Sequence, residues 1–107
     1  MTTNYEGMLN KSVLGWGNRG WPEIVDLILH VCENGALKTH VMYRCNLNSK
    51  QIQEYITFLL ERELIVASPP DEMKKVIYTT TPRGRRFMAA YEELAEIFNI
   101  NDSFVER

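Results

Sequence analysis

The sequence predicts a mainly α-helical fold that contains one small β-hairpin. Three observations support this prediction. Two short helical patterns joined by a tight turn occupy residues 38–60. Two runs rich in β-branched and aromatic residues flank a proline-containing turn in residues 63–80, and a heptad-like helix follows residue 82.

The length and composition describe one globular domain. A chain of 107 residues can bury its own core but is too short for two ordinary domains. Its 45% hydrophobic and 24% charged content is that of a globular protein, and its apolar runs are much shorter than a membrane span. The first residues contain no basic leader followed by an apolar stretch. We therefore expect a cytoplasmic protein with no membrane partner.

The chain divides into four expected regions. Residues 1–20 contain four glycines and no sustained periodicity, which predicts an irregular arm. Because Trp16 and Trp21 are large apolar side chains, we expect at least one of them to pack on the domain. A domain of three helices and a hairpin is expected at 21–81. A C-terminal helix is expected at 82–100 and a tail at 101–107.

The first helix is predicted to begin at Pro22 and to end at the Asn34-Gly35 pair. Its core-facing positions are expected to be Ile24, Leu27, Ile28 and Val31. The second helix is predicted over residues 38–45. Its apolar side is expected to contain Val41, Met42 and Cys45, followed by Asn46 at its end and Leu47 as a plug in the turn.

The third helix is predicted to follow Asn48, whose side chain can cap the first turn while Gln51 returns a hydrogen bond. An apolar stripe contains Ile52, Tyr55, Ile56 and Leu59. The opposite face is polar and contains Lys50, Gln53, Glu54 and Thr57. Such a face can contact phosphates and base edges in a DNA major groove. It can equally be the solvated face that every amphipathic surface helix has.

A β-hairpin is predicted after the third helix, with strands at 63–66 and 76–80 and Lys74 and Lys75 at its tip. Three helices followed by a hairpin describe a winged helix-turn-helix, in which the hairpin is the wing. The two lysines can contact the DNA backbone. Lysines are also common on edge strands because they deter aggregation.

The final helix is predicted from Thr81 as N-cap and Pro82 as first helical residue. Large side chains at heptad-like spacing form a narrow seam, which contains Phe87, Tyr91, Leu94 and Phe98. This seam needs a partner. The sequence allows it to pack on the first helix of the same chain or to pair with a second chain.

Charge is unevenly distributed although the formal net charge is only −2. Residues 38–86 contain nine basic and five acidic side chains, a local excess of four positive charges. The balance reverses from residue 92 onward, where five acidic side chains face one arginine. A basic middle and an acidic end are compatible with binding a polyanion through the middle of the chain.

The residues give little support for catalysis or metal binding. No phosphate-binding glycine loop, HExxH or GxSxG motif is present, so we expect no enzyme and no cofactor. Histidine and cysteine occur without the paired spacing of a metal site. Cys32 and Cys45 fall among apolar helix positions and are expected to be buried thiols.

The run from Asn34 to Ile65, followed by a hairpin and TTTPRGRRFMAAYEEL, resembles small archaeal winged helix-turn-helix DNA-binding proteins. In that family the C-terminal helix forms an antiparallel coiled-coil dimer. The pieces that carry the resemblance include Lys38-Thr39, the Leu47-Asn48 turn, Leu59-Leu60, and Thr81 with Gly84 and Phe87. The resemblance implies that the residues near DNA are Thr39, Arg44, Ser49, Lys50, Gln51 and Gln53, with Lys74 and Lys75 on the wing.

We therefore expect a homodimeric protein that binds double-stranded DNA, either a transcriptional regulator or a chromatin-associated protein. The dimerisation residues would be Phe87, Tyr91, Leu94 and Phe98. The alternative is a winged-helix adaptor that binds other proteins and not DNA. The sequence does not identify the target DNA or a small-molecule effector.

Overall fold

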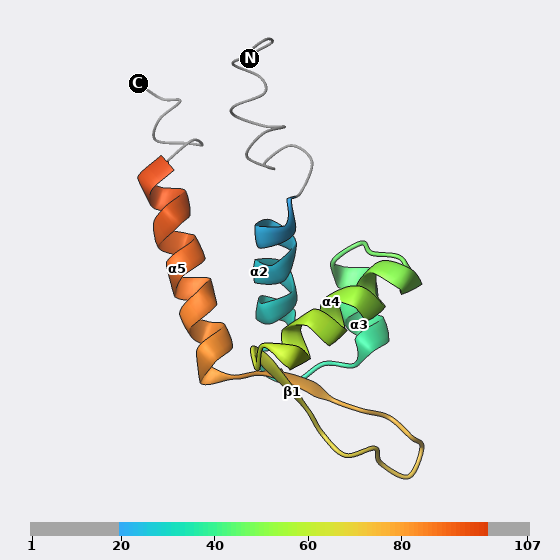
Figure 1. Cartoon of the computed structure of the whole chain (residues 1–107). Helices are drawn as coiled ribbons and strands as arrows, with labels where there is room; N and C mark the ends of the chain where they lie inside the picture. Colours follow the sequence, from blue (N-terminus) through green and yellow to red (C-terminus); the bar gives the residue numbers. More distant parts are fainter. Residues whose placement is uncertain (1–19, 99–107) are drawn as a thin grey trace.

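The computed structural model describes residues 20–98. Their helices are α2 (Trp21–Val31), α3 (Lys38–Arg44), α4 (Ser49–Glu61) and α5 (Pro82–Phe98), and their strands are β1 (Ile65–Ala67) and β2 (Tyr78–Thr80). The predicted mainly α fold with one hairpin and a final helix is therefore confirmed. The hairpin extends away from the helices, and α5 runs beside α2 (Figure 1). The predicted arm, apart from Gly20, and the predicted tail lie outside the described residues.

The core lies where α2, α3 and α4 meet. α4 contributes Ile52, Ile56 and Leu59, as predicted, whereas Tyr55 at the edge of the same stripe is only half-buried. From the other elements the buried side chains include Val25, Ile28, Leu29, Cys32, Val41, Cys45, Leu47, Ile65 and Met88. The expected burial of both cysteines and the role of Leu47 as a plug are confirmed.

The expected core position of Leu27 in α2 is wrong, because its side chain is 36% exposed. The buried side of α2 instead contains Val25 and Leu29, which have no exposed surface. This helix is covered by α5 and also by α3 and β2, so its buried face is wider than a single stripe and is rotated away from Leu27.

The expected start of the first strand at Glu63 is also wrong. Glu63 has a φ of 61° and follows the C-cap Arg62 of α4. The Leu64 N–H donates to the Leu59 carbonyl at 2.9 Å, and the Glu63 N–H donates to the Leu60 carbonyl at 3.0 Å. These bonds form the Schellman motif that ends a helix. Glu63 therefore terminates α4, and the strand begins only at Ile65.

The strands pair antiparallel with Ile65 opposite Thr80 and Ala67 opposite Tyr78. Between them residues 68–77 form the wing loop, so the second strand is shorter than predicted. The Asp71 carboxylate accepts hydrogen bonds from the backbone N–H groups of Met73 and Lys75, both at 2.8 Å. Lys74 adopts a left-handed φ of 65° inside this turn. The tip is thus organised by Asp71, which competes with strand pairing for these N–H groups.

The start of α5 is fixed by the predicted N-cap. The Thr81 hydroxyl accepts from the Gly84 N–H at 3.0 Å and donates to the Glu63 carbonyl at 2.8 Å. Gly84 is buried, and a Cβ there would clash with the Leu64 carbonyl oxygen. The absence of a side chain at Gly84 lets the start of α5 lie in close contact with Leu64, Thr80 and Leu29.

Candidate nucleic-acid interface

The first turn of α4 has the predicted capping box. The Asn48 side chain accepts from the Gln51 N–H at 2.8 Å, and the Gln51 side chain accepts from the Asn48 N–H at 3.0 Å. Two of the unpaired N–H groups at this helix end are therefore satisfied. Ser49 and Lys50 are exposed beside the cap. Gln51, predicted to lie near DNA, uses its carbonyl oxygen in this cap.

The exposed face of α4 contains a hydrogen-bonded chain of side chains centred on Gln53. The Lys38 ammonium donates to the Gln53 carbonyl oxygen at 2.8 Å, and the Gln53 amide donates to the Thr57 hydroxyl at 3.2 Å. These two contacts select one orientation of the Gln53 amide. A glutamine that presents both its oxygen and its nitrogen can recognise adenine in the major groove.

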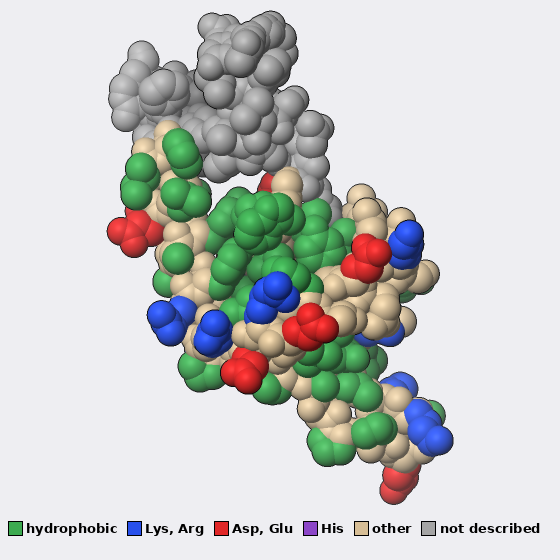
Figure 2. All heavy atoms as spheres, in the orientation of Figure 1, with side chains coloured by type: hydrophobic (Ala, Val, Ile, Leu, Met, Phe, Trp, Pro, Cys, Tyr) green, Lys and Arg blue, Asp and Glu red, His purple; other side chains and the backbone are tan. Residues whose placement is uncertain are grey.

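A shallow hollow of about 350 Å³ separates the start of α3 from the wing. We call it the basic hollow, and its lining residues are Leu37, Lys38, Thr39, Lys74, Lys75, Val76 and Tyr78. Its lining combines three lysines with the apolar side chains of Leu37 and Val76 and the ring of Tyr78. The space-filling view shows Lys and Arg side chains at the end of the hairpin, beside an acidic one (Figure 2).

The structure brings together residues that are distant in the sequence. Thr39 from α3 and Lys74 and Lys75 from the wing line the same hollow. Lys38 belongs to this hollow and also contacts Gln53, so it connects the wing side to the exposed face of α4. Of the remaining predicted residues, Arg44 is exposed in the last turn of α3. It is separated from Ser49 only by the turn at 45–48.

Lys38 was not among the predicted DNA-binding residues. The sequence contained a signal for it, because Lys38 directly precedes Thr39 and begins the basic stretch. Its central position depends on the hydrogen bond to Gln53, a residue that lies 15 positions farther along the chain. Only the packing of α3 across α4 brings these two side chains into contact.

The predicted dimerisation seam divides into two parts in the structure. Phe87 and Tyr91 are half-buried and their rings stack with centroids 6.3 Å apart. Burial and the nearby carboxylates Glu23 and Asp26 of α2 raise the pKa of Tyr91. Leu94 and Phe98, farther along α5, are each 47% exposed. The first part of the seam therefore packs within the chain and the second part faces outward.

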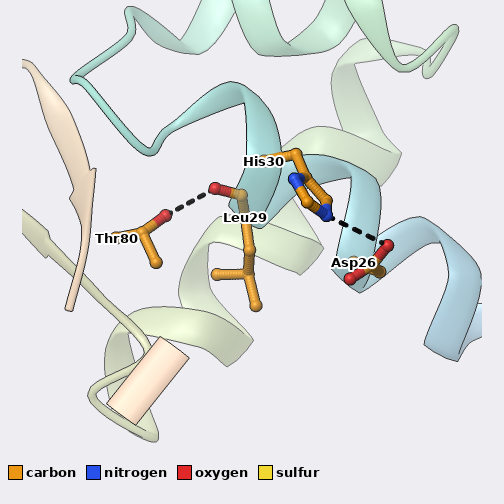
Figure 3. A network of polar contacts seen from close by, with 4 residues as sticks. All are labelled: Asp26, Leu29, His30 and Thr80. Carbon is orange, nitrogen blue, oxygen red and sulfur yellow. Dashed lines mark hydrogen bonds and ion pairs between the residues drawn. The ribbon is translucent and has the colours of Figure 1, made fainter. Parts of the chain in front are cut away.

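Two polar contacts involve α2, one that ties it to β2 and one within the helix (Figure 3). The buried Thr80 hydroxyl donates to the Leu29 carbonyl at 2.7 Å, which satisfies a carbonyl near the end of α2. One turn earlier, Asp26 lies 3.5 Å from the His30 ring nitrogen. Desolvation of Asp26 raises the pKa of its carboxyl above 3.8, with His30 acting in the opposite direction and Glu92 adding to the increase.

Other possible sites in residues 20–98 would be a cluster of metal-ligating side chains or the Cys32 thiol. This part of the chain contains no group of three or more His, Cys, Asp or Glu residues placed to hold a metal ion. Burial, and secondarily Cys45, raises the pKa of the Cys32 thiol to about 11, which makes it a poor nucleophile. Between residues 20 and 98 there is also no helix with the length and apolar character needed to cross a membrane.

The chain is similar in sequence to archaeal proteins. An uncharacterized protein of Methanocaldococcus jannaschii is 31% identical over 78 residues, which cover 72% of this chain and 74% of that protein. A second uncharacterized protein of the same organism is 33% identical over 92 residues. The match covers 85% of this chain but spans only 39% of that longer relative.

Two solved structures share this architecture. Sso10a-2, a DNA-binding protein from Sulfolobus solfataricus, superimposes with a TM-score of 0.67 at 28% identity, over 74% of this chain and 81% of that one. A transcriptional regulator of the MarR family from Rhodococcus superimposes with a TM-score of 0.58 at 25% identity, over 94% of this chain and 75% of that one. The winged helix-turn-helix family model matches residues 18–99. With this match and the helices and wing described above, the chain belongs to the winged helix-turn-helix family.

Proposed function

We propose that the chain is a DNA-binding protein, a transcriptional regulator or a chromatin-associated protein, which binds duplex DNA as a homodimer. The surface proposed to contact DNA consists of the exposed face of α4, the basic hollow and the wing. One observation carries the proposal: Lys38 joins the hollow that contains Lys74 and Lys75 to Gln53 on α4. Separate elements thus contribute to one continuous polar surface.

The residues of this surface have two proposed roles. Lys38, Lys74 and Lys75 would contact phosphates, which supplies affinity without sequence preference. Gln53 and Thr57 would face base edges when α4 enters the major groove. Arg44, Ser49 and Lys50 would extend the phosphate contacts past the start of α4. The wing lies beside α3, so it is placed to reach the backbone next to that groove.

The similar proteins support a DNA ligand. Sso10a-2 is described as DNA-binding, and the Rhodococcus protein as a transcriptional regulator. A homodimer would place two α4 helices on one duplex, which would compensate for the modest basic charge of each chain. The outward part of the seam, Leu94 and Phe98, supplies the proposed contact between chains.

A binding titration on random and genomic duplex DNA at two salt concentrations tests this function. Phosphate contacts release counterions, so affinity should fall steeply with salt. Lys74→Ala with Lys75→Ala should weaken binding to all sequences and reduce the salt slope by about 0.9 per lost contact. The matched control removes two exposed charges elsewhere, from Arg83 and Arg86 at the start of α5.

The results distinguish DNA binding from the adaptor alternative. An unchanged salt slope in the wing variant would remove the wing from the proposed surface. Absence of DNA binding at low salt by the unmodified protein would reject the function altogether and favour a protein partner. Equal effects of the wing and control variants would indicate a general charge effect and not a defined surface.

A further inference from the structure

A second surface, distinct from the proposed DNA surface, is an apolar groove between the start of α2 and the middle of α4. Its lining residues are Trp21, Glu54, Tyr55 and Phe58, and its volume is about 380 Å³. Trp21 is 59% exposed, which is unusual for the largest apolar side chain. Figure 2 shows hydrophobic side chains gathered on the face that contains α2 and α4.

The walls of this apolar groove are held in place by the fold. Phe58 packs against the core, and the Arg62 guanidinium lies 3.9 Å from the centre of its ring. The Gly20 carbonyl accepts from the Ile24 N–H at 3.1 Å, which anchors the first turn of α2 beside Trp21. The groove is therefore a preformed apolar surface, and covering it would remove aromatic area from water.

We propose that this groove is the docking site of the chain's own N-terminal segment, with Trp16 and Leu14 as the side chains that fill it. The segment of 19 residues before Gly20 joins the described domain one residue from Trp21. Trp16 lies five positions before Trp21, a separation that spans at most about 18 Å in an extended chain. Trp16 therefore starts within reach of the groove.

Tethering favours this occupant over a separate molecule. A short connection within one chain gives an effective concentration on the order of millimolar, far above that of a second chain in ordinary solution. Gly15, Gly17 and Gly20 allow the reversal that returns the segment toward α4. A contact too weak to form between separate chains can therefore form within one chain.

Charge also separates the candidate occupants. Glu54 lies on the rim of the groove. The N-terminal segment contains Lys11 and Arg19 against a single acidic residue, Glu6, so its charge complements the rim. Another exposed apolar surface, the distal part of α5, contains Glu92, Glu93 and Glu96 and would bring like charges toward Glu54.

Tryptophan fluorescence of the full chain tests the proposal because the sequence contains only two tryptophans. Trp21→Phe retains an aromatic wall and leaves Trp16 as the sole reporter. Its emission should be blue-shifted, and its acrylamide quenching should be several-fold weaker than that of free N-acetyltryptophanamide. Trp21→Ser removes the wall and should move both quantities toward those of the free compound.

Phe58→Ser in the Trp21→Phe background should expose Trp16 in the same way. The control in that background is Val66→Ser, which changes an exposed apolar residue of β1. Circular dichroism and thermal unfolding identify any variant that loses its fold. If Phe58→Ser loses its fold, Trp21→Ser still tests the proposal, because the Trp21 side chain is largely exposed and its replacement should leave the fold intact.

Three outcomes would overturn the proposal. If Trp16 is exposed to solvent in the Trp21→Phe variant, it does not occupy the groove. Trp16 that stays shielded in both groove variants packs elsewhere. Shielding that disappears on dilution, or in a monomeric Leu94→Glu background, belongs to a contact between chains. None of these measurements uses DNA, so the outcome is independent of the proposed function.

Discussion

The two halves of α5 follow the same apolar spacing but have different environments. In the first half, Gly84 and Met88 are buried and Thr81 anchors the helix to the end of α4. In the second half, Leu94 is 47% and Ile97 is 71% exposed. A heptad-like pattern thus predicts a contact surface without specifying its partner. The partner is set by where the helix runs, and the short α2 covers only part of α5.

The largest expected effect is on the outward half. Leu94→Glu should prevent the proposed dimerisation, because burial of one leucine contributes about 1.5–3 kcal/mol and the change occurs in both chains. We expect the dimer dissociation constant to rise by at least about 100-fold, with thermal unfolding of the monomer little changed. Sedimentation measures the mass, and Ala89→Glu serves as a control for charge on the same helix. A monomeric unmodified protein at tens of micromolar, roughly the range of a weak interface, would contradict the dimer proposal.

In the anchored half, a substitution should lower the stability of the single chain and not affect assembly. Gly84→Ala places a methyl group against the Leu64 carbonyl and within 2.7 Å of the Thr80 methyl carbon. We expect a loss of about 1–3 kcal/mol in the free energy of unfolding, in spite of the higher helix propensity of alanine. Urea denaturation measures it, with Arg85→Ala as the exposed neighbouring control. A more stable Gly84→Ala protein would mean that α5 can shift away from the hairpin at little cost.

A smaller loss in the free energy of unfolding is expected when the Thr80 hydroxyl, which lies just before the anchored half, is removed. Thr80→Val keeps the shape of the side chain but removes the donor to the Leu29 carbonyl. The expected destabilisation is about 1–2 kcal/mol, since a buried carbonyl loses a partner. Thr79→Val, on the adjacent half-buried residue, is the matched control in the same denaturation experiment. Equal midpoints for the two variants would assign no stability to this hydrogen bond.

The smallest expected effect concerns Asp26 of α2. This carboxyl interacts electrostatically with Glu92 and Tyr91, which lie where the two halves of α5 meet. Its Oδ1 atom is buried and has no hydrogen-bond partner among the described residues. Because burial raises its pKa in the folded state, the folded chain holds this proton more tightly than the unfolded chain. This carboxyl therefore contributes stability below its unfolded pKa and loses that contribution as pH rises through its folded pKa.

Asp26→Asn should consequently be more stable than the unmodified protein at neutral pH. The difference should shrink as pH falls through the raised pKa of Asp26, where the carboxyl is already neutral. Urea midpoints at neutral and acidic pH measure both parts, and Glu33→Gln provides an exposed carboxylate control. A variant that is less stable at neutral pH would show that the pair with His30 outweighs desolvation.

Much of the fold was determined by local sequence. The Asn48 and Gln51 cap, the Thr81 cap and the stripe of Ile52, Ile56 and Leu59 depend on residues within a few positions of one another, and the structure confirms them. The local signal was insufficient where two kinds of local structure competed. Glu63 looked like the start of a strand, but its left-handed backbone ends α4 instead.

Tertiary structure alone decided which faces are covered and which distant side chains meet. Leu27 and Val25 both belong to apolar positions of α2, and only the packing of α5, α3 and β2 around this helix selects Val25 for the core. Lys38 contacts Gln53 because α3 crosses α4, a relation that no spacing in the chain encodes. Periodicity records that a helix has an apolar side, whereas the partner of that side is determined by the paths of elements far apart in the sequence.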